Sequence, residues 1–311
     1  MIIREPKPSD KEAIIELLQL SLGENKLKKT QEIWNFKHEK NPFGVSPVFL
    51  AEENDVIIGV RVFMQWRWQL ADTVWVSYRA VDTATHPQHQ GKGIFKKLTL
   101  FALDYVQIIG DCFVFNTPND QSRPGYLKMD WKEVDKIKVS LVPTFIYLLE
   151  LFKSKNDNNT ITLSQLSKLC ESHNENLINK KLLFTPKSAQ YLKWRYEENP
   201  LQEYFVVSSE KHYIAMYVKR HKVFNELRVV ETVGDFDKKN HAAIRQVISQ
   251  FAIKERCLFI TTADKNLFSC RLYGGYGPKL TFRPMCNSDE FIKKTLDINN
   301  WSYSTGDLEL F

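Results

Sequence analysis

The sequence of 311 residues predicts an α/β protein made of two related halves, each with a mixed β-sheet flanked by helices. Two observations carry this prediction. In the first half, a strand-like run, a glycine turn, an apolar-periodic helix and a second apolar strand follow one another, which is the order of a βαβ unit with parallel strands. A segment of that half also recurs in the second half, and a repeat at about half the chain length indicates duplicated domains.

The βαβ unit is predicted between residues 75 and 115. Trp75 to Thr83 reads as a strand, and Ile94 to Ile109 has the apolar periodicity of a helix that ends near Gly110. Cys112 to Phe115 is a short continuous apolar run, typical of a strand that is buried on both faces.

The turn between the first strand and the helix reads His-Pro-Gln-His-Gln-Gly-Lys-Gly-Ile-Phe, from His86 to Phe95. Its two glycines let the backbone turn tightly and bring several N–H groups close to a ligand. Those groups and the positive end of the helix dipole favour an anion, most naturally a phosphate. Because neither a Walker lysine-serine pair nor a GxGxxG sequence is present, the turn does not fit a P-loop or a dinucleotide-binding loop.

The turn resembles the acyl-coenzyme A loop of the GNAT N-acetyltransferase superfamily, Gln/Arg-x-x-Gly-x-Gly/Ala, which usually lies three residues after a proline. Gln90 and Gly93 match this pattern with Pro87 correctly placed, whereas Phe95 stands where Gly or Ala is usual. A second register that begins at Gln88 also fits the formula, but it misplaces the proline.

The residues after the βαβ unit extend the resemblance to roughly residues 1 to 140. Asn119 is followed seven residues later by Tyr126, in the run Gly-Tyr-Leu-Lys-Met-Asp-Trp. This run is similar to the Leu-Tyr-Glu-Lys-Leu-Gly-Phe run of GNAT enzymes, except that Asp130 replaces the glycine. The resemblance implies a catalytic GNAT domain at residues 1–150 that takes acetyl-CoA as its acyl donor.

The resemblance also implies a role for each part of the site. The pyrophosphate would rest on backbone N–H groups of the loop, with Lys92 adding positive charge. The end of the preceding strand would pair with the pantetheine arm, and Asn119 would bind the same arm. Tyr126 would donate a proton to the leaving thiolate. The expected cofactor-binding residues are Ala84, Thr85, Gln90, Gly91, Lys92, Gly93, Ile94, Phe95 and Asn119.

Acetyl transfer to an amine also needs a base within hydrogen-bond reach of that amine. Asp82 is the preferred candidate because it lies on the strand that leads to the acetyl group, although strand alternation leaves its facing open. His86 could serve at neutral pH. The terminal carboxylate of Phe311 is a further candidate, since such a group is an occasional base in tandem GNAT enzymes. These alternatives stay open.

The repeated segment runs from Trp34 to Pro42 and reads Trp-Asn-Phe-Lys-His-Glu-Lys-Asn-Pro. It recurs from Leu192 to Pro200 as Leu-Lys-Trp-Arg-Tyr-Glu-Glu-Asn-Pro, an offset of 158 residues. Asn266 and Tyr273 repeat the seven-residue Asn-to-Tyr spacing of the first half. The other predicted elements are hairpins at Val48–Ala51 with Ile57–Arg61 and Tyr204–Val207 with Tyr213–Tyr217, strands at Leu227–Val233 and Cys257–Thr261, and a helix at His241–Ile253.

The second half, residues 151–311, lacks the glycine turn. Val233 to Asn240 stands in its place and carries Asp235 and Asp237. Carboxylates at a helix N-terminus would occupy or repel a phosphate site. We therefore expect a degenerate GNAT-like domain in which Tyr273 is structural.

Composition and charge restrict the other function classes. The net charge of +6 is modest and the basic residues are scattered, which disfavours a nucleic-acid partner. Five cysteines without a C-x-x-C pair favour reduced thiols over disulfides or a metal site, and indicate a cytoplasmic protein. No stretch resembles a signal peptide or a membrane span, so we expect no membrane partner.

One strand bears on the acceptor. Val60 to Leu70 alternates between an apolar face, expected in the core, and a polar face with Arg61 and Arg67, expected to be solvated rather than to line an acceptor pocket. The predicted acceptor is a primary amine of a small molecule, and resemblance to two-domain acetyltransferases of surface-polysaccharide synthesis suggests an amino sugar or its nucleotide conjugate.

Two alternatives to an acetyltransferase are a non-catalytic acyl-CoA-binding or interaction module and a Fem-type aminoacyl transferase. The Fem type, which uses aminoacyl-tRNA, is disfavoured by the CoA loop and by the scattered basic charge.

Overall fold

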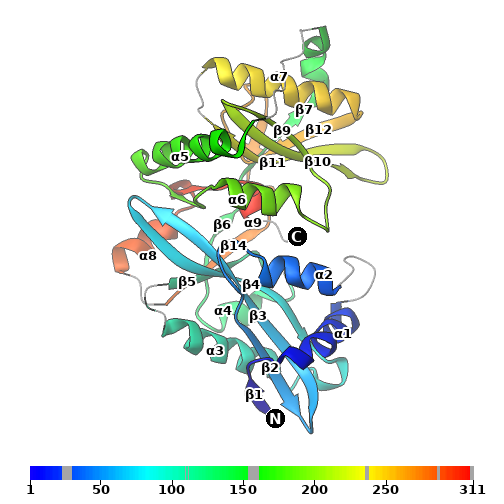
Figure 1. Ribbon diagram of the computed structural model, residues 1–311, viewed down its shortest axis with the longest axis vertical. Helices are drawn as coiled ribbons and strands as arrows, with labels where there is room; N and C mark the ends of the chain where they lie inside the picture. The colour runs from blue at the N-terminus through cyan, green and yellow to red at the C-terminus, as the bar shows by residue number, and fades with distance from the viewer. Residues whose placement is uncertain are drawn as a thin grey trace. The chain divides into compact units, whose positions relative to one another are not determined.

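Figure 1 shows the computed structural model, which describes residues 1–22, 30–108, 110, 112–152, 161–234, 238–285 and 288–308. The chain forms two compact units, each assembled from separate segments. The first consists of Met1–Trp68, Thr73–Asp135 and Lys279–Ile298, and the second of Gln69–Asp72, Lys136–Pro278 and Asn299–Phe311.

The first unit is built on a mixed sheet. Its strands, in spatial order, are β1 (Ile2–Arg4), β2 (Val48–Glu53), β3 (Val56–Leu70), β4 (Thr73–Thr85), β5 (Cys112–Asn116), β14 (Lys279–Pro284) and β6 (Lys132–Lys136). The β1–β2, β2–β3 and β5–β14 pairs are antiparallel, whereas β4 and β5 are parallel. The helices are α1 (Lys11–Leu22), α2 (Gln31–Trp34), α3 (Ile94–Gln107), α4 (Arg123–Leu127) and α8 (Asp289–Thr295).

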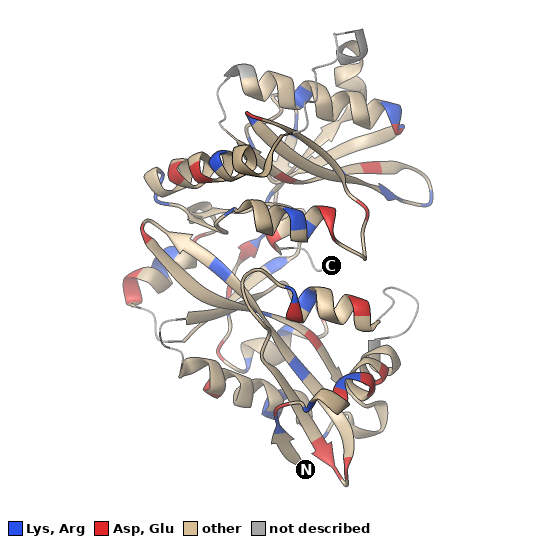
Figure 2. Ribbon diagram, viewed as in Figure 1, with Lys and Arg blue, Asp and Glu red and all other residues tan. Residues whose placement is uncertain are grey.

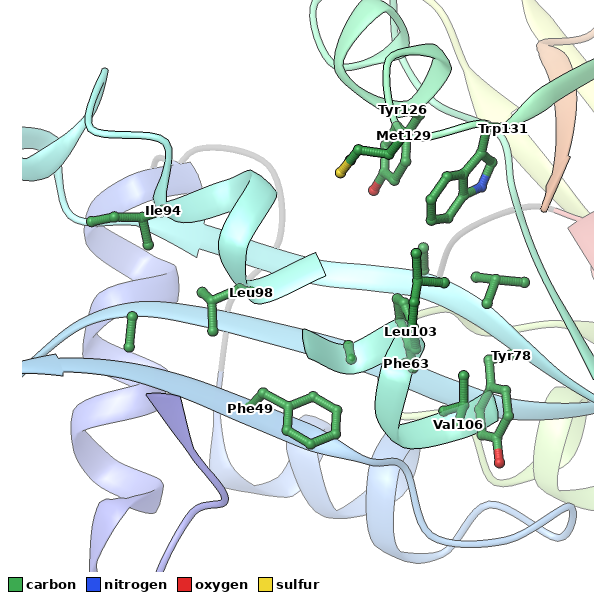
Figure 3. Close-up of a cluster of buried hydrophobic side chains, with 14 of the residues drawn as sticks. Phe49, Phe63, Tyr78, Ile94, Leu98, Leu103, Val106, Tyr126, Met129 and Trp131 are labelled. Atoms are coloured by element: carbon green, nitrogen blue, oxygen red, sulfur yellow. The ribbon is translucent and has the colours of Figure 1, made fainter. Parts of the chain in front are cut away.

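The predicted βαβ unit is confirmed as β4–α3–β5. The register pairs Val76 with Cys112, and α3 packs against β2 and β4. One side of α3 is apolar and enters a buried cluster with aromatic residues of the strands (Figure 3). Its members include Phe49, Phe63, Tyr78, Leu98, Leu103, Val106, Tyr126, Met129 and Trp131.

The strand β3 is only partly as expected. Its apolar face is fully buried from Val60 to Trp68, as predicted, whereas Leu70 is half-buried. On the other face Arg61 is 0% exposed, so the expectation of a solvated face is wrong there. The reason is that α3 and α4 cover this part of the strand, because Phe63 belongs to the cluster with Leu98 and Tyr126. Arg67, further along, is exposed as expected.

The second unit has a mixed sheet of its own. Its strands, in spatial order, are β13 (Leu272–Gly274), β7 (Val139–Pro143), β12 (Cys257–Thr262), β11 (Asn225–Gly234), β10 (His212–Arg220) and β9 (Phe205–Ser209). The short strand β8 (Leu183–Phe184) pairs with β15 (Trp301–Ser302) and with the last two residues of β3. The helices are α5 (Leu163–Asn179), α6 (Ala189–Leu192), α7 (Lys238–Lys254) and α9 (Thr305–Leu308), with a 3-10 segment at Thr144–Phe152.

This sheet repeats the pattern of the first. Strands β11 and β12 are parallel and are joined by α7, and β9–β10 is the predicted antiparallel hairpin. The hydrophobic core lies where α7 packs against the sheet, with Ile244 and Ile248 among its fully buried residues. Lys and Arg are interspersed with Asp and Glu along both units (Figure 2).

The repeated segment forms the same rare element twice. In the first copy, Thr30 caps α2 by accepting from Ile33, and the helix continues into a π-helical turn at Asn35–Glu39. In the second copy, Ser188 caps α6 in the same way, and the π-helical turn spans Lys193–Glu197. All these positions are related by the offset of 158. Because π-helix accounts for well under 1% of residues in globular proteins, its recurrence supports a duplication.

The duplication is not a simple division of the chain. Strand β14, from the second half of the sequence, lies beside β5 in the first unit, and β7, from the first half, lies between β12 and β13 in the second. The assignment of domains to residues 1–150 and 151–311 stays a prediction, and part of its expected boundary, residues 153–160, lies outside the described residues.

Among the described helices, none has the length and apolar character needed to span a bilayer. Of the cysteines, Cys112, Cys170 and Cys257 are buried free thiols and Cys270 is an exposed one, whereas Cys286 lies outside the described ranges.

Candidate active site

The glycine turn lies between β4 and α3 and faces open space. Gly91 and Gly93 have φ angles of +78° and +73°, in the left-handed region that favours glycine. No heavy atom lies within 4 Å of the position that a Cβ would take at either residue. Gly93 is the N-cap of the 14-residue helix α3, and no side chain of the described residues caps it. The first N–H groups of the helix are therefore available to a ligand.

The start of the turn is held by His86. Its backbone N–H donates to the carbonyl of Ile58 at 2.9 Å, and its Nδ1 accepts from the N–H of Gln88 at 3.3 Å. Lys92 is exposed, and its Nζ lies 3.4 Å from Nδ1 of His89. Lys92 therefore adds a positive charge to the side of the turn, whereas one ring nitrogen of His86 is already used by the backbone.

The residues predicted to contact pantetheine lie on both sides of the turn. Ala84 and Thr85 are the last residues of β4, and the carbonyl of Thr85 accepts from the hydroxyl of Ser21 at 3.2 Å. Asn119 is exposed, and its Oδ1 accepts from the N–H and the hydroxyl of Ser122, each at 2.8 Å. Asn119 therefore organises the start of α4, and its contact with a cofactor stays a prediction.

Tyr126 lies on α4 and is buried next to the loop. Its ring packs edge-on against Phe95, the last loop residue, with centroids 5.4 Å apart, and against Trp131 at 5.1 Å. The phenol oxygen accepts a hydrogen bond from Nη1 of Arg61 at 2.9 Å. The structure therefore brings the predicted proton donor, Tyr126, into direct contact with the predicted cofactor loop. It also places Arg61, whose burial the sequence did not predict, against the phenol oxygen.

Asp82 faces a different part of the domain. It has a φ of +38°, and its buried carboxylate forms an ion pair with Lys37 and lies 3.0 Å from Nε2 of His38. The other ring nitrogen of His38 lies 3.0 Å from the hydroxyl of Ser46. The neighbouring residue Thr83 instead accepts from Arg61, so adjacent positions on β4 serve two separate networks. Lys37 and His38 belong to the repeated segment, which is the signal that could have located this cluster.

Two comparisons with known proteins agree with this geometry. Residues 2–134 match a family model described as an acetyltransferase (GNAT) domain. This part of the chain is a GNAT domain. The match confirms the predicted family and the predicted class of enzyme, an N-acetyltransferase. No protein of curated description matches the chain.

Solved structures show the same fold over nearly the whole chain. A GCN5-related N-acetyltransferase from Anabaena variabilis has a TM-score of 0.67 at 10% identity, covering 92% of this chain and 73% of its own. Eis1 from Mycobacterium abscessus has a TM-score of 0.60 at 11% identity, covering 96% and 76%. The N-myristoyltransferase of Saccharomyces cerevisiae with bound myristoyl-CoA has a TM-score of 0.53 at 12% identity, covering 91% and 82%. The predicted fold class, tandem GNAT-like α/β domains, is confirmed.

The last residue of β11, at the end of the strand that precedes α7, is closely packed. A Cβ on Gly234 would lie 2.3 Å from the carbonyl oxygen of Lys211. Asn240, in the first turn of α7, donates to that same carbonyl at 2.9 Å and lies 3.1 Å from Nδ1 of His212. Asp235 and Asp237 lie outside the described residues, as does Phe311, one of the candidate bases.

Tyr273 also differs from its counterpart in the GNAT domain. It lies on the edge strand β13, where it pairs with Ser140, and it is 43% exposed. Tyr126 lies instead on a helix and is almost fully buried. The predicted structural role of Tyr273 is not tested by this contrast, but the two environments are not equivalent.

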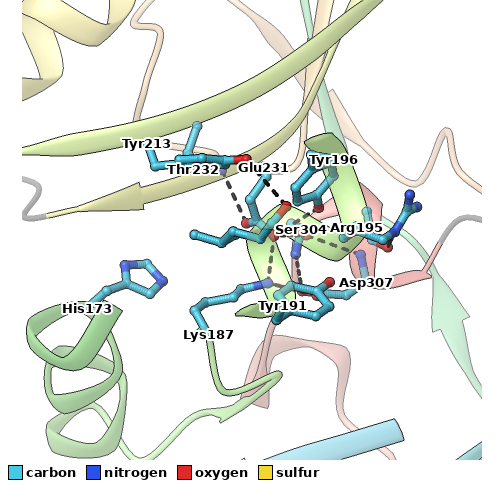
Figure 4. A network of polar contacts seen from close by, with 12 residues as sticks. His173, Lys187, Tyr191, Arg195, Tyr196, Tyr213, Glu231, Thr232, Ser304 and Asp307 are labelled. Atoms are coloured by element: carbon cyan, nitrogen blue, oxygen red, sulfur yellow. Dashed lines mark hydrogen bonds and ion pairs between the residues drawn. The ribbon is translucent and has the colours of Figure 1, made fainter. Parts of the chain in front are cut away.

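The second unit contains a buried network of charged groups (Figure 4). Nζ of Lys187 donates to Glu231 and to Asp307, each at 2.7 Å. Burial alone would lower the pKa of Lys187, but the two carboxylates raise it above its ordinary value. Burial raises the pKa of Glu231 despite the neighbouring ammonium. The hydroxyl of Tyr196, in the second π-helical turn, donates to Glu231 at 3.0 Å.

A hollow of about 460 Å³ follows this π-helical turn, between Tyr196 and Val206 of the second unit. None of the predicted site residues lines it, so it is not part of the site assembled around the glycine turn.

Proposed function

We propose that the protein is an acetyl-CoA-dependent N-acetyltransferase that acetylates a primary amine of a small molecule. The observation that carries the proposal is the open glycine turn at the N-terminus of α3, with Tyr126 packed against its last residue. The turn provides a place for a phosphate, and the tyrosine provides a proton close by.

The chain's own groups fit the donor. The backbone N–H groups from Gln90 to Phe95 would donate to the pyrophosphate, as amides at helix N-termini do for anions, and Lys92 would add charge. The backbone of Ala84 and Thr85 and the side chain of Asn119 would bind the pantetheine arm. Acetyl-CoA, when bound, supplies the activated acetyl thioester.

Proton transfers complete the reaction. Tyr126 would protonate the departing sulfur, and general acids of this kind contribute roughly 100- to 10,000-fold to rate. A base must also take a proton from the amine. Asp82 is the proposed candidate, but its contacts with Lys37 and His38 give its burial a second explanation, as an anchor of the π-helical turn.

The narrower proposals concern the acceptor and the second unit. The acceptor class is an amino sugar or its nucleotide conjugate, on the basis of the resemblance alone. The aspartates that stand in the sequence where the first half has its glycine turn support a second domain that has lost the phosphate site. A cytoplasmic location is proposed from the reduced cysteines.

The test is thiol release from acetyl-CoA across a panel of amines, with isothermal titration of acetyl-CoA beside it. Amino sugars, nucleotide amino sugars, polyamines and amino acids form the panel, and myristoyl-CoA serves as an alternative donor. Amine-dependent thiol release with one bound acetyl-CoA per chain is the expected result. Tight binding without thiol release for any amine would instead indicate a non-catalytic acyl-CoA-binding module.

A further inference from the structure

Arg61 is a buried cation without a buried anion. Its side chain, on β3, is 0% exposed, and among the described residues no carboxylate pairs with it. Nη1 donates to the hydroxyl of Thr83 and to the phenol of Tyr126, whereas Nε and Nη2 are buried without a hydrogen-bond partner in the described part of the chain.

Two buried lysines of this protein, in contrast, are each paired with a carboxylate. Lys37 pairs with Asp82, and Lys187 pairs with Glu231 and Asp307. Burying a charge without a counter-ion destabilises a fold, because the charge loses its hydration and gains no partner. A buried polar group without a partner therefore needs an explanation, and a catalytic role is one of them.

Aromatic rings surround the guanidinium. Its central carbon lies 4.9 Å from the ring centre of Phe63, 5.3 Å from that of Tyr126 and 5.6 Å from that of Phe95. Phe95 stands where the loop pattern has Gly or Ala, and a Cβ on Gly125 would lie 3.2 Å from its ring. The rings exclude water, so a charge that forms on the Tyr126 oxygen would interact strongly with Arg61.

We infer that Arg61 is the positioning residue for Tyr126 and the counter-ion of the phenolate that forms during acetyl transfer. The inference rests on the proposed function. Because Nη1 donates to the phenol oxygen, the phenol O–H is directed away from Arg61 and can donate to another group. The only buried anion that this guanidinium meets is then the one produced by the reaction, which stabilises the transition state more than the ground state.

Acetyl transfer conserves atoms and electrons. The amine lone pair forms the C–N bond, and the C–S bond breaks with its electron pair on sulfur. Sulfur takes the proton of Tyr126, which leaves a phenolate beside the Arg61 guanidinium. The base takes the excess proton from nitrogen and passes it to solvent, and solvent returns a proton to the phenolate.

The test compares Arg61→Met, Arg61→Lys and the control Arg67→Met, which removes an exposed arginine of the same strand. By analogy with the removal of one oxyanion donor, Arg61→Met should lower kcat by roughly 100-fold. The Kd of acetyl-CoA should stay within about twofold, and the urea midpoint should be unchanged or higher, because an unpaired buried charge is removed. Arg61→Lys should recover part of kcat, and Arg67→Met should change neither quantity.

A double-mutant cycle shows whether Arg61 acts through Tyr126. In the Tyr126→Phe background, Arg61→Met should cause no further loss of kcat, since no phenolate can form there. An equal loss in both backgrounds, a lower urea midpoint in Arg61→Met or an unchanged kcat would overturn the inference. A wild-type protein that binds acetyl-CoA but acetylates no amine would overturn the proposed function, and the inference with it.

Discussion

The two units place a carboxylate at the same point of the same strand. In the first unit Val76 pairs with Cys112, and Asp82 follows six residues later on β4. In the second unit Asn225 pairs with Cys257, and Glu231 follows six residues later on β11. The two acids therefore lie at corresponding places along the two strands, although the pairing of β11 with β12 shifts by one residue after Asn225.

Each carboxylate contacts the residue at the equivalent position of the π-helical turn in its own unit. His38 lies 3.0 Å from Asp82, and Tyr196, which is its equivalent at the offset of 158, donates to Glu231 at 3.0 Å. The contact is present also in the second unit, whose sequence lacks the glycine turn. The contact between the carboxylate and the π-helical turn is therefore part of the fold that the two units share. The open glycine turn and the Arg61–Tyr126 pair distinguish the first unit.

The largest expected effect comes from truncating the chain after residue 150, which separates the two sequence halves. A chain that ends at residue 150 keeps the glycine turn but loses β14, which pairs with β5 from Phe113 to Asn116. Phe282 of that strand is fully buried against Phe113, with ring centroids 5.0 Å apart. Loss of the strand exposes the edges of β5 and β6 and apolar surface. We expect an insoluble protein, or a soluble one without a cooperative urea transition.

Solubility and urea unfolding are measured for residues 1–150 expressed alone and for the same fragment co-expressed with residues 151–311 as a separate chain. Co-expression should restore solubility, because the second fragment carries β14. A first fragment that unfolds cooperatively and acetylates on its own would show that the exchanged strand is dispensable.

The second effect is on the cofactor. Gly93→Asp places a carboxylate and a Cβ in the open turn, where a phosphate must approach, and should weaken acetyl-CoA binding beyond detection by isothermal titration. Gly93→Ala is the matched control, because it places a Cβ at the same left-handed φ without the charge, and it should lower the free energy of unfolding by about 1–2 kcal/mol. The wild type should bind one acetyl-CoA per chain, since the sequence of the second half lacks the glycine turn. Two equivalent sites, or unchanged affinity in Gly93→Asp, would remove the distinction between the units.

The third effect is on chemistry. Tyr126→Phe should lower kcat roughly 100- to 10,000-fold, because a general acid is lost. The Kd of acetyl-CoA should change little, since the phenol matters only once charge develops on sulfur. Tyr273→Phe is the internal control and should keep full activity. A loss of turnover in the Tyr273 variant alone would mean that the catalytic and degenerate halves are reversed.

Local patterns predicted the elements of both units but not their assembly. Strand and helix periodicity located β4, α3 and β5, and the repeated segment indicated the duplication. A strand such as Lys279–Pro284 carries no local signal for the sheet that it joins, because pairing partners are distant in sequence. Similarly, alternation on β3 divides two faces, but it cannot show that helices cover both around Arg61. Asp82 could be placed on its strand, whereas its contact with Lys37 and His38 depends on tertiary packing.

The fourth effect distinguishes a structural role of Asp82 from a catalytic one. Asp82→Asn and Glu231→Gln each remove a carboxylate from a buried lysine, and breaking such a pair typically destabilises a fold by about 3–5 kcal/mol. The loss should be smaller in Glu231→Gln, because Asp307 still pairs with Lys187. If both acids are anchors, urea unfolding should show a loss in each variant, and kcat of the folded Asp82→Asn enzyme should stay within about threefold. A selective collapse of kcat in Asp82→Asn, with stability retained, would instead assign Asp82 as the base.

The smallest effect uses pH to perturb the second unit alone. His173, on α5, is buried, and its Nδ1 accepts from the N–H of Gly234, the last residue of β11, at 3.3 Å. Burial lowers the pKa of His173 to about 4, from an ordinary value of 6.5. Between these values the unfolded chain binds a proton that the folded unit does not. This stabilising contribution, at most about 3 kcal/mol, is therefore complete above pH 6.5 and is lost as the pH falls towards 4.

Urea unfolding of the wild type at pH 5 and pH 7, compared with His173→Leu, isolates this contribution. The difference in unfolding free energy between the two pH values should be smaller in the variant, with a residual slope of the same sign from His212, whose pKa burial also lowers. The exposed-loop variant His89→Gln should keep the wild-type difference. Because His173 contacts the end of β11 and not the glycine turn, the Kd of acetyl-CoA for folded protein should not follow the same pH dependence. If acetyl-CoA affinity fell in parallel with His173 protonation, the end of β11 would be coupled to the cofactor site after all, and the two units would not differ as described.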